Sequence, residues 1–421
     1  MAAQGAARYT DRETTEMRRR HRDNRIEPPI QAELLLHELA FDGGCVSHFE
    51  GKTVFVDCGI PGERVIAELN RERAGVLFGR VVDVLEPSSE RINPPCDYFG
   101  ECGGCQLQHV AYQAQLDFKR GIVVQQLRRI GGFDNPPVSP TIGSENTFGY
   151  RNHIRFTAKP RGEVGFVRRG THRFLRIDRC LIADPWVNDA LPKVQERAGG
   201  LHQIAIRYGV KTGEVLVHPD LSSLGIDIES GQKHYHEEIL GHRFRISGAS
   251  FFQTNTPQAE RLITLAGDRL DLRPDDTLCD AYAGVGTFAV VLADRVKKVV
   301  AIEESSAAVD DAMVNIAKSP NVQYYRGKVE QVLPELNEVM DALILDPPRA
   351  GIHPAAIDAV LRKAPARIAY VSCDPATLAR DLKLLAAGPT GGSRYDLTDV
   401  TPVDMFPQTY HIECVASMRL A

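Results

Sequence analysis

The stretch DAYAGVGTF, residues 280–288, marks the point at which a short apolar strand is expected to turn into a helix. Its glycines, Gly284 and Gly286, would let the backbone approach a ligand closely at such a turn. Further apolar strands follow at KKVVAIEE, VQYYRG, DALILDPP and RIAYVSCD, with helical segments such as SSAAVDDAMVNIAKS between them. This alternation predicts an α/β fold with a doubly wound parallel sheet, in a C-terminal domain that we place at residues 249–421.

The glycine-rich turn by itself fits nucleotide cofactors in general, and the third glycine of the NAD fingerprint is absent. Glu303 ends the next strand, where a carboxylate can accept hydrogen bonds from the hydroxyls of a ribose. Together the two features favour an adenosine-containing cofactor. The alternative for Glu303 is a solvated acid at the start of a helix.

Three reactive side chains close later strands. Asp346 follows the fourth strand in LDPPRAG, and we interpret it as facing the ligand crevice rather than as part of a rigid surface turn. Cys373 follows the fifth strand and precedes a helix, whose start is expected to lower the thiol pKa and favour a nucleophile over a buried structural cysteine. Glu413 stands among apolar residues in the last strand, HIECVASMRL, where the alternative is an edge-strand glutamate that faces water.

The residues before this domain divide into three parts. Residues 1–27 contain the basic run RRRHRDNR and predict a flexible basic arm. Residues 28–90 carry short strands between turn signals such as FDGG and CGIPGE, which predict a small β-barrel. Residues 91–248 form a central, β-rich domain with one helix, over 109–132, that ends at paired glycines.

A dense group of cysteines opens this central domain, in CDYFGECGGC at residues 96–105. Cys96, Cys102 and Cys105 are three of nine cysteines, an odd number in a chain without a secretory signal, so a disulfide framework is not expected. A closed tetrahedral site needs a fourth thiol, and Cys180 in RIDRCLIAD is the best candidate. Four thiolates suit either zinc or an iron–sulfur cluster, and the spacing leaves both open.

The formal net charge of −5 argues against a nucleic-acid binder on the overall balance, so such a function must rest on a local patch. Residues 150–176 provide such a patch, because this stretch contains eight basic residues and only one acid, Glu163. Aromatic residues are interleaved with the basic ones. Basic side chains contact phosphates and aromatic rings stack on unpaired bases, so we expect RNA as the partner. The basic residues are Arg151, Arg155, Lys159, Arg161, Arg168, Arg169, Arg173 and Arg176.

No apolar run reaches the roughly 18 residues of a membrane span, and the N-terminus MAAQGAARYT lacks the apolar core of a secretory signal. The sequence therefore predicts a cytoplasmic protein without membrane attachment. No obligate protein partner is evident from it.

Taken together, CDYFGECGGC, FFQTN, DAYAGVGTF, LDPPRAG, VSCDP and HIE resemble the RNA uracil-5-methyltransferase family, most of all its branch that methylates 23S ribosomal RNA. The resemblance implies a Rossmann-like, class I methyltransferase domain that uses S-adenosylmethionine, and a TRAM (OB-like) barrel at residues 28–90. It implies that the 109–132 helix packs on the catalytic domain. It also implies a [4Fe–4S] cluster held by Cys96, Cys102, Cys105 and Cys180.

The resemblance further implies a role for individual residues. Cys373 matches the nucleophile that adds to C6 of uracil and makes C5 reactive towards a methyl group. Glu413 matches the base that removes the C5 proton, and Arg349 is a candidate substrate contact. Contacts to S-adenosylmethionine are implied for Gln253, Tyr282, Thr287, Glu303 and Asp346. Because the target base must leave its stack to reach Cys373, a loop uridine of 23S rRNA is the expected substrate.

Three alternatives stay open. The same chemistry on a tRNA loop uridine needs the same catalytic residues. A non-catalytic RNA-binding protein with a metal knuckle would be expected to lack at least one of Cys373, Glu413 and Asp346, and all three are present. A cytosine-5 methyltransferase is disfavoured, because those enzymes usually place a cysteine directly after the Pro-Pro pair, where this chain has Arg349.

Overall fold

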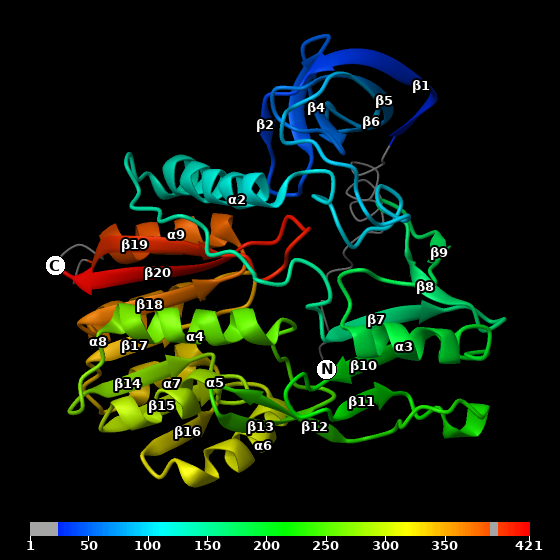
Figure 1. The fold of residues 1–421 in the computed structure, drawn as a ribbon. Coiled ribbons are helices and arrows are strands. Elements are labelled where there is room, and N and C mark those ends of the chain that lie inside the picture. Colours follow the sequence, from blue (N-terminus) through cyan, green and yellow to red (C-terminus); the bar gives the residue numbers. More distant parts are fainter. Residues whose placement is uncertain (1–23, 388–394) are drawn as a thin grey trace, which may run out of the picture. The chain divides into compact units, whose positions relative to one another are not determined.

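The computed structural model describes residues 24–387 and 395–421. The chain forms two compact units (Figure 1): the first comprises residues up to 94 together with 106–111, and the second comprises residues 95–105 and 112–421. Of the expected basic arm, residues 1–23 lie outside the described residues, and the first strand already begins at Asn24.

The first unit is a sheet of six strands in the order β1-β5-β6-β4-β3-β2. Along β4 the side chains of Val54 and Val56 are buried whereas those of Thr53 and Phe55 are only half-buried, which is the two-residue period of a strand with one buried face. The strands are β1 (Asn24–Leu35), β2 (Glu38–Leu39), β3 (Cys45–Phe49), β4 (Lys52–Asp57), β5 (Arg64–Arg73) and β6 (Val76–Glu86).

The C-terminal part of the second unit is a seven-stranded sheet in the order β16-β15-β14-β17-β18-β20-β19. Its first five strands in this order are parallel, and β20 runs antiparallel to both β18 and β19. The predicted doubly wound sheet is therefore confirmed. The strands are β14 (Thr277–Ala281), β15 (Lys298–Glu303), β16 (Val322–Arg326), β17 (Ala342–Leu345), β18 (Arg367–Ser372), β19 (Tyr395–Val403) and β20 (Glu413–Leu420).

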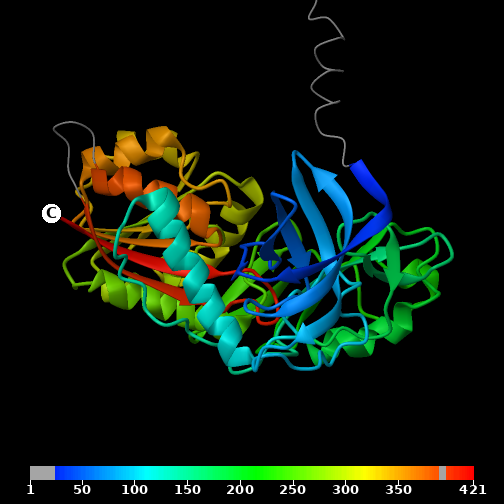
Figure 2. The ribbon, with the colours of Figure 1, turned by 90° about the horizontal axis from the view of Figure 1, so that it is seen from above.

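Helices cover both faces of this sheet. Seen from above, α4 lies on one side of the strands and α8 and α9 lie on the other (Figure 2). The buried strand residues Val299, Ile344, Val371 and Val415 share one core with residues of α4, among them Leu262. The helices are α4 (Thr256–Leu270), α5 (Thr287–Val291), α6 (Ser306–Asn315), α7 (Val329–Glu335), α8 (Pro354–Lys363) and α9 (Pro375–Ala387), with 3₁₀ turns at Ala293–Arg295 and Ile316–Lys318.

The middle of the chain forms a five-stranded sheet in the order β11-β10-β7-β8-β9. Phe156, Ile204 and Ile206 from this sheet and Leu191 from α3 share one buried cluster. The elements are β7 (His153–Ala158), β8 (Val164–Val167), β9 (Phe174–Arg176), α3 (Pro185–Val194), β10 (Gln203–Tyr208), β11 (Val215–His218) and a 3₁₀ turn at Ser222–Leu224.

Two elements that precede residue 249 pack against the C-terminal domain. The hairpin β12 (His234–Ile239) and β13 (His242–Ser247) buries Tyr235 and Phe244 in the C-terminal core. Helix α2 (Tyr112–Gln126) continues as a π-helix over Leu127–Gly131 and contacts α9 and β19. Within residues 24–387 and 395–421, no helix is long and apolar enough to cross a membrane.

Candidate active site

Cys373 and Glu413 stand opposite each other at the ends of two neighbouring strands. Strands β18 and β20 pair antiparallel, with Ser372 opposite Cys414. Continuing this register by one residue places Cys373 opposite Glu413, and such partners have Cα atoms about 4.5–5.5 Å apart. Glu413 is only 5% exposed and β20 lies between β18 and β19, so the interpretation as a water-facing edge residue is excluded.

The thiol of Cys373 is half-buried, and its pKa is raised to about 11, first by burial and next by the charge of Glu413. Arg349 acts in the opposite direction, through its charge and through a hydrogen bond with the thiol. The expectation that the start of α9 lowers this pKa is wrong. The carboxylate of Asp374 takes the first amides of the helix, accepting from Ala376 and Thr377 at 3.0 and 2.9 Å.

The carboxyl of Glu413 has a pKa raised to about 8, because burial and then the charge of Asp346 disfavour its ionised form. Arg349 again lowers the value. A carboxylate with so high a pKa is a stronger base than an exposed carboxylate with an ordinary pKa. Such a group is suited to removing a proton from a substrate.

Arg349 also reaches the loop before β20. Its Nη2 lies 3.4 Å from Nδ1 of His411, the residue two places before Glu413. Burial and the charge of Arg349 lower the pKa of His411 to about 4, so its imidazole is neutral at pH 7. Sequence reasoning did not single out His411, although it is the first residue of the HIE motif.

Three carboxylates gather at the carboxyl ends of β14, β15 and β17, namely Asp280, Glu303 and Asp346. Asp280 is fully buried, and its pKa is raised to about 8 by burial and next by the charge of Asp346. Asp346 is half-buried, and its pKa is raised to about 7 by burial and by Glu303. Asp280 was missed at the level of sequence, although it opens the DAYAGVGTF turn.

The backbone of the glycine turn is open. Gly284 has φ +58°, and a Cβ added there would meet no atom within 4 Å. Glu303 fixes the turn, since its Oε2 accepts the amide of Gly284 at 2.9 Å and its Oε1 accepts that of Ser305 at 2.7 Å. Tyr282 is half-buried with φ +69°, and Thr287 begins α5 directly after the turn.

Gln253 lies apart from these strand ends in sequence, between β13 and α4. Its Oε1 is buried and has no hydrogen-bond partner among the described residues. Buried polar atoms are nearly always paired, so an orphaned acceptor of this kind indicates a donor supplied by a ligand or by water. Within the described chain, no hydrogen bond joins Gln253 to the other predicted cofactor residues.

The four candidate cluster ligands lie in one region of the second unit. Burial is the first cause of the raised pKa of Cys180, and the charges of Cys102 and Cys96 add to it. The charges of Cys105 and Cys180 both contribute to the raised pKa of Tyr150, after burial. Asn188 of α3 fixes the Cys180 backbone through bonds of 2.9 and 3.0 Å. In the part of the chain that the structure describes, however, no three or more His, Cys, Asp or Glu side chains are arranged to hold a metal ion.

The basic run 150–176 passes through β7, β8 and β9 beside the cysteine loop, since Cys102 and Arg168 form an antiparallel bridge. Arg168 also pairs with Glu101. Tyr150 and Phe156 are buried in the core and cannot stack on bases, whereas Phe166 and Phe174 are half-buried.

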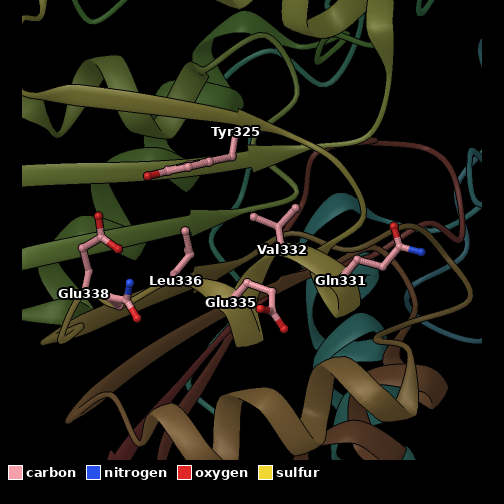
Figure 3. Close-up of a pocket in the computed structure, with 7 residues that line it drawn as sticks. Tyr325, Gln331, Val332, Glu335, Leu336 and Glu338 are labelled. Atoms are coloured by element: carbon pink, nitrogen blue, oxygen red, sulfur yellow. The ribbon is translucent and has the colours of Figure 1, made fainter.

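A pocket of about 610 Å³ lies beside the edge strand β16 and α7 (Figure 3). Its lining includes Tyr325, Val332 and Leu336 together with the acids Glu335 and Glu338. None of the predicted catalytic, cofactor or cluster residues lines it, so we do not assign the chemistry to it.

Comparison with known proteins gives a consistent class. A family model described as tRNA (Uracil-5-)-methyltransferase matches residues 238–419. An uncharacterized RNA methyltransferase of Synechocystis sp. is 33% identical over 92% of this chain and 95% of its own length. One of Halalkalibacterium halodurans is 33% identical over 92% of this chain and 96% of its own. The chain therefore belongs to the RNA methyltransferase family.

Among solved structures, the chain is similar to Pyrococcus abyssi tRNA (uracil-54, C5)-methyltransferase in complex with S-adenosyl-L-homocysteine. The TM-score is 0.72 with 26% sequence identity, over 92% of this chain and 100% of that one. The fold is thus that of a class I methyltransferase, and the predicted enzyme class is confirmed.

Proposed function

We propose that this protein methylates C5 of uridine in RNA, with S-adenosylmethionine as the methyl donor. The placement of Cys373 and Glu413 at adjoining ends of the paired strands β18 and β20, with the charge of Arg349 acting on the thiol, is the observation that carries the proposal. A nucleophile and a base at one strand end are what methylation of an unreactive ring carbon requires. The family model and the Pyrococcus abyssi relative, both named for uracil-5 methylation, support the same reaction.

In the first step the Cys373 thiolate forms a bond to C6 of uracil. The electrons of the C5–C6 double bond move towards C5 and O4, so C5 becomes nucleophilic. Arg349 stabilises the thiolate before attack, since its charge lowers the Cys373 pKa. S-adenosylmethionine supplies the methyl group to C5 and leaves as S-adenosylhomocysteine.

In the second step Glu413 removes the proton from C5. The electrons of that C–H bond re-form the C5–C6 double bond, the bond from sulfur to C6 breaks, and the thiolate leaves. The raised pKa of Glu413, about 8, makes its carboxylate a competent acceptor for this proton. The protonated acid then returns its proton to solvent.

The residues present fit a methyl donor of the adenosine type. Glu303 ends the second strand, where it would accept from ribose hydroxyls, and the open backbone at Gly284 allows a close approach. The unpaired Oε1 of Gln253 would accept a hydrogen bond from the ligand. Tyr282, Thr287 and Asp346 complete the proposed binding set.

A loop uridine of 23S rRNA is the proposed substrate, on the strength of the CDYFGECGGC resemblance. A tRNA loop uridine is the second candidate, because the family model and the Pyrococcus abyssi relative are both named for tRNA. The basic run 150–176 would contact phosphates in either case.

We also propose that Cys96, Cys102, Cys105 and Cys180 hold a [4Fe–4S] cluster and that the six-stranded sheet of the first unit is a TRAM-type RNA-binding module. Four thiols in one region, electrostatically coupled to one another or to a shared neighbour, support the cluster. The thiols would have to converge further than in this structure. Bound, the cluster would tie residues 96–105 to Cys180 and so stabilise the central sheet.

The test uses anaerobically purified protein, methyl-labelled S-adenosylmethionine, and unmodified 23S rRNA fragments or tRNA. The labelled nucleoside is identified after digestion. Label in 5-methyluridine from an rRNA loop supports the whole proposal, and label in tRNA alone keeps the reaction and replaces the substrate. Label in any other nucleoside contradicts the reaction.

A further inference from the structure

The segment between β19 and Glu413, residues 404–412, is buried over most of its length, and we call it the Glu413 loop. Asp404, Met405 and Ile412 are fully buried, and Thr409 is 1% exposed. The loop leads directly into the proposed base, so its position decides where the Glu413 carboxyl lies relative to Cys373.

Four consecutive carbonyls of this loop each accept a hydrogen bond from a side chain outside it. Backbone carbonyls in a loop normally turn to water or to neighbouring backbone, so this arrangement leaves the loop little freedom. The donors are Gln258 to Asp404 at 2.9 Å, Asn255 to Met405 at 3.0 Å, Lys119 to Phe406 at 3.2 Å and Tyr150 to Pro407 at 2.9 Å.

Helix α2 contributes a buried ion pair. Lys119 is 1% exposed, and its Nζ lies 2.5 Å from Oδ1 of the fully buried Asp404. The hydroxyl of Tyr112, about two turns earlier on the same helix, donates to the other oxygen of Asp404 at 2.8 Å. Both carboxylate oxygens are therefore held by α2, a helix that lies almost 300 residues earlier in the chain.

A second contact from α2 fixes a strained point of the loop. Gln408 has φ +69°, a conformation that residues other than glycine rarely adopt. Its side-chain oxygen accepts from Nε2 of Gln115 at 3.0 Å, and its amide donates to Oε1 of Gln115 at 3.2 Å. This reciprocal pair holds the turn from which Tyr410, His411 and Glu413 follow.

We propose that α2 positions the base: Gln115 and Lys119 are positioning residues that hold the Glu413 loop so that Glu413 reaches the C5 proton. The inference rests on the proposed function, because it assigns α2 to the second chemical step of that reaction. A base must lie within hydrogen-bond reach of the proton it removes, and a displacement of about 1 Å can slow a reaction about 100-fold. Cys373 follows β18 and lies outside this loop, which reaches it only through Arg349 and Glu413, so the first step should be slowed much less than the second.

The experiment compares Gln115→Leu with Gln113→Leu, an exposed glutamine two residues away on the same helix. Rapid-quench reactions with methyl-labelled S-adenosylmethionine follow two quantities: label in a denaturation-resistant RNA–protein adduct, and label in free RNA. For Gln115→Leu we expect adduct formation within about threefold of wild type and release slowed about 10- to 100-fold, so the adduct accumulates. Gln113→Leu should behave as wild type.

Gln408→Gly removes the bond from Gln115 Nε2, keeps the backbone amide that donates to Gln115 Oε1, and suits φ +69°, so it provides a second test if Gln115→Leu does not fold. Because Gln115→Leu already removes both bonds to Gln408, the double variant should release RNA no more slowly than Gln115→Leu alone. A purely structural role of α2 would slow adduct formation and release by the same factor. That result, or release at the wild-type rate, overturns the proposal.

The wild-type protein separates this inference from the proposed function. If wild type forms neither the adduct nor 5-methyluridine, the reaction itself is wrong. If wild type forms both and Gln115→Leu releases RNA normally, the reaction stands and the positioning role of α2 is wrong.

Discussion

The thiol of Cys373 and the carboxyl of Glu413 each have a raised pKa, about 11 and about 8. Burial is the first cause for both, and the charge of Glu413 adds to the shift at Cys373. The pair therefore titrates as a coupled system in which the two charges do not coexist easily. The charge of Arg349 opposes both pKa shifts, because it favours the ionised form of each group.

A first prediction concerns the pH dependence of the thiol. The thiolate is the reactive form of the proposed nucleophile, so the rate of Cys373 alkylation by iodoacetamide should rise with pH towards about 11. Arg349→Gln removes the charge that lowers this pKa and should move the rise to higher pH, while Arg349→Lys should keep it near that of wild type. Peptide mass spectrometry resolves Cys373 from the other cysteines. An unchanged profile in Arg349→Gln would remove Arg349 from this role.

A second prediction concerns Asp280. Its pKa is raised from an ordinary 3.8 to about 8, so the folded protein holds a proton that the unfolded chain releases. The free energy of unfolding should therefore fall as pH rises from about 4 to about 8. Asp280→Asn keeps an oxygen for the amide of Ala289 and removes the buried charge. The melting temperature of Asp280→Asn should exceed that of wild type at pH 9. The difference between the two proteins should be larger at pH 9 than at pH 5, by on the order of several °C.

Asp275→Asn is the control for this prediction, because Asp275 is exposed in the same segment. Its melting temperature should follow that of wild type at both pH values. A destabilised Asp280→Asn at pH 9 would show that the carboxylate of Asp280 makes favourable contacts that outweigh its burial.

At the scale of elements, the strand ends were the most predictable feature. Parallel strands are continuous apolar runs, and polar residues directly after them face the crevice, which is why Glu303, Asp346 and Cys373 could be chosen from sequence. Their geometry follows from the order of the strands. The antiparallel insertion of β20 beside β18, which brings Glu413 to Cys373, has no local signal in the sequence.

Other features could not be predicted, for identifiable physical reasons. Strand β19 reads YDLTDVTPV, in which acids and a proline interrupt the apolar pattern, yet it pairs along most of β20. Lys119 is a buried lysine whose partner, Asp404, lies 285 residues away, and charged residues are ordinarily expected at the surface. The thiol pKa was predicted in the wrong direction because burial and the charge of Glu413, neither of which is visible in the sequence, raise it.

A third prediction addresses the cysteine loop. If the four cysteines hold a [4Fe–4S] cluster, Cys102→Ser should lose most of the iron and part of the soluble protein, since the ligands join residues 96–105 to Cys180 across the sequence. Iron and sulfide are measured after anaerobic purification. Cys58→Ser, in the first unit, is the control and should keep its iron. Equal iron in both variants, or zinc in wild type, would contradict the cluster.

At the scale of the whole molecule, the charge is unevenly distributed. The net charge is −5, yet residues 150–176 concentrate basic side chains around the central sheet. Some are already paired, as Arg176 is with Glu196 at 3.0 Å. A local basic surface on an acidic protein can bind the phosphate backbone of RNA, while the acidic surface elsewhere repels that backbone. This arrangement favours a defined orientation of the RNA.

A fourth prediction follows from the depth of the site. Glu413, the proposed base, is almost fully buried, so on the proposed mechanism the target base leaves its stack and enters the protein. Unstacking costs a few kcal/mol and is least costly in a loop, so a uridine in a hairpin loop should be methylated about tenfold or more faster than the same uridine in a duplex. The comparison uses two RNAs that share the flanking sequence. Equal rates would contradict base flipping as the mode of entry.

The fate of RNA on Glu413→Gln shows whether Cys373 and Glu413 act in sequence on one uridine. Glutamine keeps the size and the hydrogen-bonding capacity of the side chain but cannot take the C5 proton. We predict a methylated RNA–protein adduct that survives denaturation, with the RNA attached to the tryptic peptide that contains Cys373. Release of free 5-methyluridine RNA at the wild-type rate, or attachment at another residue, would contradict the account.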